Sequence, residues 1–463
     1  MTSLPFLDSV RVMPPLDRTR LARLVDAERA TFRSARPRSL ELYRRADHLF
    51  GRVPMTWMNM WSGGPIYLDR AWGNRVLDVD GHEYVDFALG DTGAMAGHSP
   101  LPTTTAVTRR ISELGGITTM LPTEDAEWVG AELTRRFGLP LWSFTLTATD
   151  ANRWAIRLAR LATGRPKILT FAYCYHGSVD EAFAVPGPDG VAVARRGLVG
   201  APVPLAETTR VAEFNDLAGV EAQLARGDVA AVLTEPALTN IGIVLPEPGF
   251  LAGLRELATA YGALLMIDET HTLSAGPGGA TALWGLEPDI LVVGKSIGGG
   301  IPSGAYGLTP AVADRVGADP DADLVDVGGV GGTLAGNALS VAAMRATLEH
   351  VLTEPAFEHM VRLATAYTDG VRATIQHAGL PWSVQQLGAR AEYRFASPAP
   401  RDGSSAAAVG DDALDEYLHL FLANRGVLLT PFHNMALMCP ATSEEDVALH
   451  TRLFAEAVEQ LTA

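Results

Sequence analysis

The stretch that decides the fold is residues 263–302, which read ALLMIDETHTLSAGPGGATALWGLEPDILVVGKSIGGGIP. It contains two short apolar runs, ALLMID and DILVVG, with the length and composition typical of buried β-strands. Asp268 ends the first run and Lys295 follows the second, and neither side chain belongs in an apolar core. Ligands of open parallel α/β sheets bind outside the carboxyl ends of the strands, so we expect this acid and this amine to face one pocket.

An acid and an amine in one pocket suit a cofactor that needs both groups. A lysine amine forms a Schiff base with an aldehyde, and pyridoxal phosphate also needs a carboxylate that keeps its ring nitrogen protonated. Taken alone, Lys295 at the start of a surface loop and Asp268 as a helix cap are the simpler interpretations. Together, and with three glycines at 298–300, they favour a cofactor site.

Composition limits the class of protein. With 463 residues, 47% of them hydrophobic, the chain can bury a large core, and we expect two or more domains. Its net charge of -16 gives no electrostatic signature for nucleic acid or for an anionic membrane surface. Cys174 and Cys439 are too few for a disulfide framework and lie in no metal-like cluster. With no secretory signal and no apolar run long enough to span a membrane, the sequence predicts a soluble cytoplasmic protein without a metal site.

The order of apolar patterns predicts an α/β protein with a large and a smaller domain. Residues 1–64 are expected to form an N-terminal arm, with a helix over 17–36, and a small-domain segment. Residues 65–335 begin with a meander of short strands and then alternate strand and helix signals, which predicts a large domain with a mostly parallel sheet. Residues 336–463 are expected to form the smaller α/β domain, with a flexible insertion at 397–412.

Three further strand ends carry polar residues toward the same edge of the sheet. Residues 147–150, TATD, stand where a strand ends and a helix begins, so their free amides suit a phosphate, although plain helix capping leaves the same pattern. Tyr175 and His176 follow the next strand and offer an aromatic face to a planar ring, although a loop tyrosine more often only packs. Glu235 follows another strand. With Asp268 and Lys295, these residues predict one site.

At this point the sequence resembles a known family. The motifs Asp268-Glu269-Thr270, Gly294-Lys295 with GGGIPSGAYG, and GTLAGN at 332–337 are similar to those of the class III pyridoxal-phosphate aminotransferases, which include glutamate-1-semialdehyde aminomutase. The interval between the aspartate and the lysine also fits that family. The resemblance runs from about residue 66 to the C-terminus and is strongest over 235–337.

The resemblance implies a role for each matching residue. Lys295 would form the Schiff base with pyridoxal 5'-phosphate and move the proton between substrate and cofactor, and Asp268 would pair with the pyridinium nitrogen. The phosphate, the ring faces and the phenolic oxygen would be contacted by the other cofactor-binding candidates, Ala148, Thr149, Tyr175, His176, Glu235 and Thr270. Thr333 would reach the phosphate of the neighbouring subunit in a homodimer with shared active sites.

Several positions depart from the family pattern, among them Leu146, Ala148, Asp150 and Thr270. Ala148 stands where the family commonly has glycine, and because alanine tolerates a positive φ worse than glycine, the phosphate turn is expected to differ in shape. Thr270 replaces the usual valine and would add a hydroxyl to the cofactor environment.

The pocket walls, rather than the shared lysine chemistry, would select the substrate. Carboxylate substrates generally call for a bidentate arginine. However, Thr56-Trp57-Met58 stands where related branches supply a substrate-binding Arg or Ser, and residues 430–434 stand where some relatives carry a clamp arginine. Arg390 and Arg394 remain candidates, although each also suits an ion pair. An apolar or aromatic donor is favoured by the wall residues Trp57, Met58, Trp61 and Phe432.

We therefore expect a class III transaminase that moves an amino group from an amine or hydrophobic amino acid to a keto acid or other carbonyl acceptor. An aminomutase or amino-acid racemase with the same cofactor is favoured by the GTLAGN motif but disfavoured by the missing N-terminal carboxylate binder. A non-catalytic scaffold is suggested by Leu146, Ala148 and Asp150, although the retention of Asp268 and Lys295 argues against it.

Overall fold

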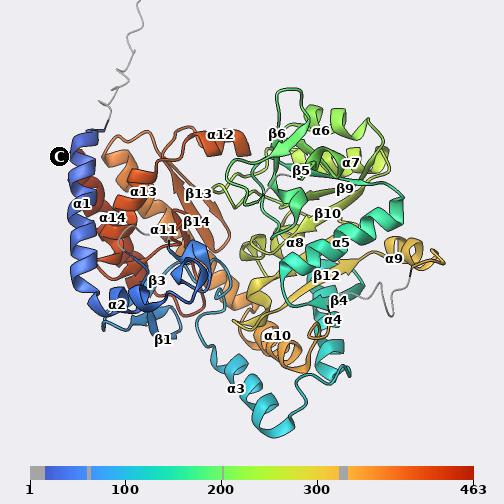
Figure 1. Ribbon diagram of the computed structural model, residues 1–463, viewed down its shortest axis with the longest axis horizontal. Helices are drawn as coiled ribbons and strands as arrows, with labels where there is room; N and C mark the ends of the chain where they lie inside the picture. The colour runs from blue at the N-terminus through green and yellow to red at the C-terminus, as the bar shows by residue number, and fades with distance from the viewer. Residues whose placement is uncertain (1–15, 60–63, 201–202, 323–331) are drawn as a thin grey trace, which may run out of the picture.

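The computed structural model describes residues 16–59, 64–200, 203–322 and 332–463. These residues form two lobes (Figure 1). One lobe contains the beginning and the end of the described chain, where helix α1 (Arg18–Ala35) packs against α13 (Asp412–Ala423) and α14 (Glu444–Thr462). The middle of the chain forms the other lobe (Figure 1).

The middle of the chain builds a seven-stranded sheet in the order β4-β12-β11-β10-β9-β5-β8. All neighbours are parallel except those of β12, which runs antiparallel to both β11 and β4. The strands are β4 (Leu141–Thr145), β5 (Lys167–Phe171), β8 (Thr209–Ala212), β9 (Val229–Thr234), β10 (Leu264–Asp268), β11 (Ile290–Gly294) and β12 (Gly304–Leu308). The predicted α/β class with a mostly parallel sheet is confirmed.

The strands β10 and β11 lie in the middle of this sheet because both of their faces are apolar. All five residues of each strand are buried. Successive side chains of a strand point to opposite faces, so Leu291 and Val293 join one core while Ile290 and Val292 join the other. A strand covered on both faces requires a continuous apolar run, and the runs of β10 and β11 are of this kind.

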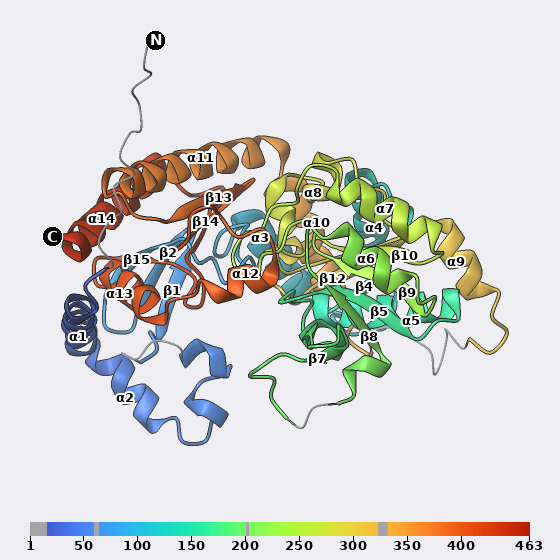
Figure 2. The same ribbon diagram turned by 90° about the horizontal axis from the view of Figure 1, so that it is seen from above.

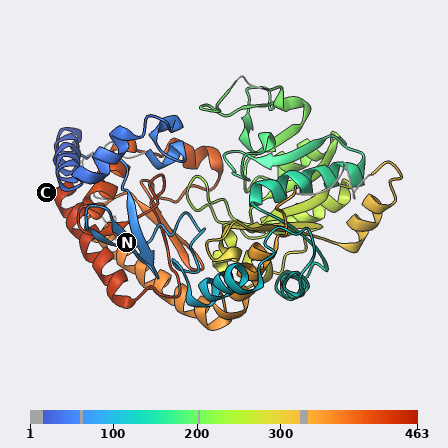
Figure 3. The same cartoon turned by 60° about the horizontal axis from the view of Figure 1, so that its bottom comes forward.

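Helices cover both faces of the large sheet. Helix α5 lies across one face and shares its core, whereas α4 and α10 share the core of the other face and pack together with α3 (Figure 3). The helices of this lobe are α3 (Leu101–Arg109), α4 (Glu124–Phe137), α5 (Ala148–Thr163), α6 (Leu217–Leu224), α7 (Phe250–Ala260), α8 (Gly279–Leu283), α9 (Pro310–Gly317) and α10 (Ala338–His350). A short hairpin of β6 (Ala184–Pro186) and β7 (Ala192–Ala194) completes it.

The other lobe contains two small sheets, in the orders β1-β2-β3-β15 and β13-β14-β16. Its strands are β1 (Leu68–Trp72), β2 (Arg75–Asp78), β3 (Glu83–Asp86), β13 (Ser383–Leu387), β14 (Arg390–Arg394), β15 (Val427–Leu428) and β16 (Met435–Leu437). Its remaining helices are α2 (Pro37–Arg45), α11 (Glu354–His377) and α12 (Gly403–Ala408). Helix α11 lies along β13 and β14 (Figure 2).

The meander β1–β3, which we expected within the large domain, belongs to the sheet of the other lobe. Strand β15 runs parallel to β3, with Val427 opposite Val85. The sheet therefore joins the meander to the C-terminal segment, and the lobe boundary does not fall at residue 65. Pairing between segments so far apart in sequence depends on main-chain hydrogen bonds that leave no local sequence pattern.

The segment 397–412, expected to be flexible, contains a helix. Helix α12 begins with a capping box, in which the Ser405 amide donates to the Asp402 carboxylate over 2.7 Å. Composition alone missed this helix because serine and glycine are frequent both in loops and at helix starts.

Two properties of the described chain bear on its class. Within the described ranges, no helix is both long and apolar enough to cross a membrane. The same residues hold no group of three or more His, Cys, Asp or Glu side chains arranged to bind a metal ion. Cys174 and Cys439 are both free thiols in the interior.

Candidate active site

The carboxyl ends of β10 and β11 border a cavity of about 480 Å³. Because these strands are parallel neighbours, Asp268 and Lys295 both reach this cavity. Its lining residues are Gly90, Gly93, Ala94, Leu146, Thr147, Ala148, Thr149, Tyr175, Gly177, Asp268, Thr270, His271, Lys295, Gly300, Ile301, Pro302 and Ser303. We call this space the lysine cavity.

Asp268 is an ionised carboxylate in the lysine cavity. Its Oδ2 accepts a hydrogen bond from Asn152 Nδ2 over 2.8 Å and lies 2.9 Å from His176 Nδ1, while its Oδ1 accepts from the Thr270 amide over 3.0 Å. Burial by itself would raise the pKa of Asp268, but the hydrogen bonds from His176, Thr270 and Asn152 outweigh burial and lower it to about 2. The cavity therefore offers a fixed negative charge to a cationic ligand group.

The first turn of α5 lies at the same cavity. Thr147 caps the helix by accepting a hydrogen bond from the Asp150 amide over 3.1 Å. Ala148 is the first helical residue and has no positive φ, so alanine causes no backbone strain there. The remaining first-turn amides have no partner within the helix and suit an anionic group.

The loop after β5 packs tightly on this turn. Gly177 has a φ of +75°, and a Cβ at this position would lie 2.1 Å from Thr149 Oγ1. Only glycine therefore fits here. The Ser178 amide donates to the same Thr149 hydroxyl over 3.3 Å, which fixes the loop carrying Tyr175 against the start of α5.

The amine of Lys295 contacts an acid and a histidine that come from different segments. Its Nζ donates to Asp91 Oδ2 over 2.8 Å and to the Asp91 carbonyl oxygen over 3.1 Å, and it lies 2.7 Å from His271 Nε2. Burial would raise the pKa of Asp91, but the charges of Lys295 and its neighbours hold it well below its usual range. Asp91 is therefore an ionised partner of the amine.

A buried arginine lies on the other side of the histidine. Arg390, in β14, is only 1% exposed, and its Nη2 lies 3.0 Å from His271 Nδ1. The same Nη2 donates to the Thr92 hydroxyl, which in turn lies 3.2 Å from His271 Nδ1. Burial and the nearby charge of Lys295 lower the pKa of His271 well below its usual range, so this imidazole is neutral.

The residues around the amine hold an uncommon backbone conformation. Lys295, Asp91 and Thr92 have φ values of 53°, 50° and 81°. A residue with a side chain in the left-handed region costs about 1–3 kcal/mol, which the surrounding packing must offset. Such strained residues cluster at functional sites, and this cluster supports a functional role for the amine and its two neighbours.

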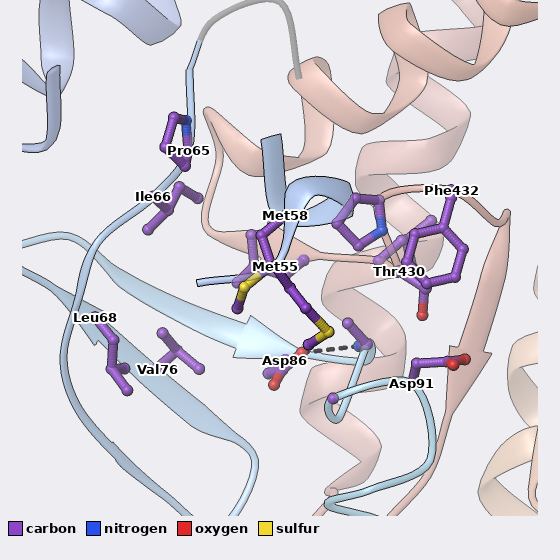
Figure 4. Close-up of a pocket in the computed structure, with 15 residues that line it drawn as sticks. Met55, Met58, Pro65, Ile66, Leu68, Val76, Asp86, Asp91, Thr430 and Phe432 are labelled. Atoms are coloured by element: carbon purple, nitrogen blue, oxygen red, sulfur yellow. Dashed lines mark hydrogen bonds between the residues drawn. The ribbon is translucent and has the colours of Figure 1, made fainter. Parts of the chain in front are cut away.

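A second, largely apolar cavity of about 320 Å³ adjoins the first at Gly90. Its wall is formed by Met55, Met58, Pro65, Ile66, Leu68, Val76, Asp86, Ala88, Gly90, Asp91, Leu428, Leu429, Thr430, Pro431 and Phe432. Figure 4 shows Met55 and Met58 in this space, with Ile66 on one side and Phe432 on the other. Asp91 belongs to this wall and also contacts Lys295, so the apolar cavity leads to the amine.

The predicted cofactor residues fall into two groups. Those that line the lysine cavity are Ala148, Thr149, Tyr175, Asp268, Thr270 and Lys295. His176 instead lies behind Asp268 and contacts its carboxylate, and Glu235 accepts hydrogen bonds from the Thr239 hydroxyl and amide. Neither of these two residues lines the lysine cavity in the described part of the chain.

Thr333 lies at a separate cavity of about 470 Å³. That cavity is formed by residues 117–122, 332–333 and 335–338 and shares no described lining residue with the lysine cavity.

The predicted substrate residues are also divided. Met58 and Phe432 line the apolar cavity, but Arg394 donates to the Ala406 carbonyl oxygen over 2.7 Å and lines neither cavity. The prediction for Trp61 falls outside the described residues, as does the side chain of Trp57.

Glu235 makes a test of stability possible. Burial, partly offset by His176 and Thr239, raises the pKa of Glu235 from 4.5 to about 7. Because the folded protein holds this proton more tightly than the unfolded chain, the group contributes fully to the free energy of unfolding below pH 4.5. This contribution, roughly 3 kcal/mol, is lost as the pH rises through about 7. Glu235→Gln is expected to remove this pH dependence and to stabilise the protein at pH 8. Urea unfolding of both proteins at pH 5 and pH 8 would measure it, and an unchanged difference between the two pH values would contradict the prediction.

The sequence interpretation missed Asp91, Thr92 and His271. Asp91 and Thr92 precede Gly93 in a loop after β3, and His271 follows the predicted Asp268-Glu269-Thr270 motif directly. The position of His271 was the available signal, because a polar side chain just beyond the carboxyl end of β10 must point toward the same edge as Asp268. Asp91 gave no such signal, because the strand before its loop, β3, belongs to a sheet of the other lobe.

Comparison with known proteins identifies the family. The profile of the class-III aminotransferases matches residues 58–458. A glutamate-1-semialdehyde 2,1-aminomutase from Anaeromyxobacter sp. (strain Fw109-5) is 34% identical over 433 residues, which cover 91% of this chain and 99% of the relative. A glutamate-1-semialdehyde aminomutase from Pseudomonas aeruginosa PAO1, solved in complex with PMP, is 50% identical with a TM-score of 0.93 over 96% of this chain and 99% of its own. An omega-transaminase from Sphaerobacter thermophilus is 30% identical with a TM-score of 0.83, over 92% of this chain and 98% of its own.

The residues of the lysine cavity fit the cofactor of this family. The ionised Asp268 suits a pyridinium nitrogen, the first turn of α5 suits a phosphate, and the amine of Lys295 suits an aldehyde. The buried hydroxyl of Thr270 has no hydrogen-bond partner among the described atoms and is available to a ligand. The chain therefore belongs to the class III aminotransferase family and uses pyridoxal 5'-phosphate as its cofactor.

Proposed function

We propose that this enzyme is an aminotransferase that takes the amino group from an amine with an apolar body and passes it to a carbonyl acceptor. The apolar cavity next to Lys295 carries this proposal. Among its described lining residues there is no Arg, Lys or His, whereas Asp86 and Asp91 are acids. A substrate carboxylate would meet negative charge in this cavity, while an apolar body would gain about 25 cal/mol for each Å² that it buries.

The proposed mechanism assigns the cofactor-holding roles to residues of the lysine cavity. Pyridoxal phosphate, when bound, supplies an aldehyde for the substrate amine and a ring that withdraws electrons from the substrate carbon. Asp268 would keep the ring nitrogen protonated because it stays ionised at neutral pH. The first turn of α5 would hold the phosphate through its amides, and Tyr175 and Thr270 would border the ring.

Lys295 moves the proton in this proposal. Its neutral Nζ takes a proton from the substrate carbon and becomes an ammonium, which Asp91 stabilises across 2.8 Å. With the cofactor bound, Nζ would then release this proton to it and return to its neutral form. Asp91 is thus the residue that holds the charge between the two transfers.

An aminomutase is the second candidate, and the names of the relatives support it. The Anaeromyxobacter and Pseudomonas proteins, at 34% and 50% identity, are both named glutamate-1-semialdehyde aminomutases. An aminomutase returns the amino group to another carbon of the same molecule, so it releases no keto product. The apolar, acidic wall of the substrate cavity favours the aminotransferase over this alternative.

Product analysis separates the two candidates. The holoenzyme would be incubated with primary amines, hydrophobic amino acids and glutamate-1-semialdehyde, each with and without a keto-acid acceptor. The proposal expects an apolar amine to yield a carbonyl product only when the acceptor is present. Efficient conversion of glutamate-1-semialdehyde into an isomer without an acceptor, together with no turnover of apolar amines, would establish the aminomutase instead.

We also propose that the enzyme acts as a homodimer with shared active sites. Exposed apolar side chains next to the Thr333 cavity support this proposal, since Met120 is 81% and Leu121 is 70% exposed. Burying such residues against a second copy would remove this apolar surface from water. Light scattering after size exclusion would test the dimer, and a monomeric mass for the active enzyme would contradict it.

Phe432→Ala tests the substrate wall. Loss of the ring is expected to reduce kcat/KM for an aromatic amine by about tenfold or more, since a buried phenyl group contributes roughly 1.5–3 kcal/mol. A short aliphatic amine that does not reach Phe432 should lose little. Phe50→Ala is the matched control, because Phe50 is 91% exposed and lines neither cavity. Equal losses for both amines in Phe432→Ala would remove Phe432 from the substrate wall.

A further inference from the structure

A single imidazole ring stands between the amine of Lys295 and the buried guanidinium of Arg390. Nε2 of His271 lies 2.7 Å from Lys295 Nζ, and its Nδ1 lies 3.0 Å from Arg390 Nη2. The ring is 12% exposed, and the arginine is 1% exposed. Both distances are those of hydrogen bonds, so each needs a hydrogen between its two nitrogen atoms. The ring proton must therefore reside on one particular nitrogen.

The neighbours of Nδ1 determine which nitrogen carries that proton. Arginine has only hydrogen-bond donors, so Nδ1 must accept from Arg390. The Thr92 hydroxyl oxygen already accepts from Arg390, which leaves its own hydrogen free to point at Nδ1 across 3.2 Å. Both neighbours thus donate to Nδ1. Burial and the adjacent Arg390 both lower the pKa of His271 and keep it neutral, so its one ring proton resides on Nε2, which faces Lys295.

We propose that His271, oriented by Arg390 and Thr92, is a positioning residue that donates its Nε2 proton to the free amine of Lys295 and so favours the uncharged amine that accepts a proton. An ammonium has no lone pair for this hydrogen bond, so the contact favours the uncharged amine alone. Asp91 favours the ammonium instead, from 2.8 Å. The inference rests on the proposed role of Lys295 as the group that moves the proton.

The two opposing partners suit a group that must both take up and release a proton. A lysine amine that contacts only a carboxylate remains a charged ammonium and cannot take up a proton. A lysine amine that contacts only a hydrogen-bond donor cannot keep the proton that it takes from the substrate. The other charged or titratable groups around this pair are Arg390 in β14, Asp268 in β10, Tyr175 after β5, and His433 after β15. Arg390 favours the uncharged amine, and the carboxylates favour the ammonium.

The lysine content of the chain makes a direct test possible. Lys295 and Lys167 are its only two lysines, and Lys167 forms an ion pair with Asp228 over 3.1 Å in β5, outside both cavities. The full-length chain without cofactor would be labelled with acetic anhydride over a range of pH, and each lysine would be followed by mass spectrometry. For each lysine, the acetylation rate at neutral pH is divided by the plateau rate at alkaline pH. This ratio gives the uncharged fraction of the amine, because the accessibility of the amine to the reagent affects both rates equally. Lys167 reports whether the fold is intact.

Three variants make the expected outcomes distinct. His271→Met, which has no donor, should lower the uncharged fraction of Lys295 at neutral pH roughly fivefold to tenfold, in line with the loss of one hydrogen bond. His271→Gln, which retains an N–H donor, should restore most of it. Asp91→Asn should raise it. Lys167 should not change in any of them, and an unchanged Lys295 in His271→Met, or equal losses in the Met and Gln variants, would overturn the proposal.

Thr92→Val gives an independent test if His271→Met does not fold. It removes the hydroxyl that points at Nδ1 without touching Lys295, and it should lower the uncharged fraction of Lys295 in the same direction by a smaller factor. No change in this variant, with Lys167 also unchanged, would overturn the orienting role of Thr92 and Arg390.

The holoenzyme separates a failure of this inference from a failure of the proposed function. Borohydride trapping of cofactor on Lys295 tests the role of the lysine itself. If no cofactor is trapped there, the proposed function fails whatever the labelling shows. If it is trapped, His271→Met should move the acidic half-point of the kcat profile upward by about one pH unit, whereas a merely structural role would lower kcat equally at every pH.

Discussion

Replacing Lys295 with alanine is expected to reduce amino-group transfer by about 10⁴-fold or more, a loss of roughly 5 kcal/mol in transition-state stabilisation. The expectation follows from the two tasks that we propose for one atom, because Nζ would both form the covalent bond to the cofactor and move the proton. Alanine has neither a nucleophile nor a base, and Asp91 and His271 would then face each other without the amine that links them. Single-turnover kinetics with an apolar amine would measure the loss.

Lys167→Ala is the matched control for this experiment. It removes the only other lysine, whose amine is paired with Asp228 at 3.1 Å and lines neither cavity. This variant should keep its activity and its borohydride-trapped cofactor, and Lys295→Ala should lose both. An active Lys295→Ala enzyme, or trapped cofactor on Lys167, would show that the lysine cavity had been misassigned.

Asp268→Asn is expected to reduce catalysis by about 10³-fold, or roughly 4 kcal/mol. The amide cannot carry the negative charge that keeps a ring nitrogen protonated, so the cofactor loses most of its ability to withdraw electrons. The loss should fall on the proton-transfer step rather than on cofactor binding, because the first turn of α5 still holds the phosphate. Rapid-scanning absorbance of the first half-reaction would follow this step directly.

The same substitution should also lower stability. In the wild-type protein, Asn152, His176 and the Thr270 amide all contact oxygens of the Asp268 carboxylate. The NH2 group of an asparagine would point at one or more of these partners and leave a donor without an acceptor. One unsatisfied buried donor costs about 1–3 kcal/mol. Asp228→Asn is a suitable control, because that carboxylate is paired with Lys167 and Arg210 away from both cavities. If Asp268→Asn and this control have equal activity, Asp268 has no role at the ring nitrogen.

Local sequence was sufficient for the part of the site that lies on one sheet. The carboxyl ends of parallel strands meet at one edge, and Asp268, Lys295, Thr149 and Tyr175, each at or just beyond a strand end, line the lysine cavity. Positions along the sequence did not predict whether a residue at that edge lines the cavity or lies behind a residue that does. His176 therefore proved to lie behind Asp268, although it adjoins Tyr175 in sequence.

The apolar cavity on the substrate side is lined by residues from both ends of the described chain, and it could not be predicted in the same way. Met58 and Phe432 meet in one apolar cavity only because β15 pairs with β3 and carries the following loop to the N-terminal segment. Arg394 faces Ala406 instead, while Arg390, four residues earlier on the same strand, reaches His271. Sequence left both arginines as candidates because neither contact is local.

The sequence by itself determined the mostly parallel sheet, the family and the placing of Asp268 and Lys295 at one cavity, since each depends on short-range patterns: apolar runs, strand ends and adjacent motifs. Only the tertiary structure decided what surrounds Lys295. Asp91, His271 and Arg390 come from three segments that are far apart in sequence, and their contacts depend on how the two lobes pack. Charge and hydrogen-bond geometry act over a few ångströms in space, whatever the separation along the chain, and the protonation of the amine is therefore a property of the packed lobes.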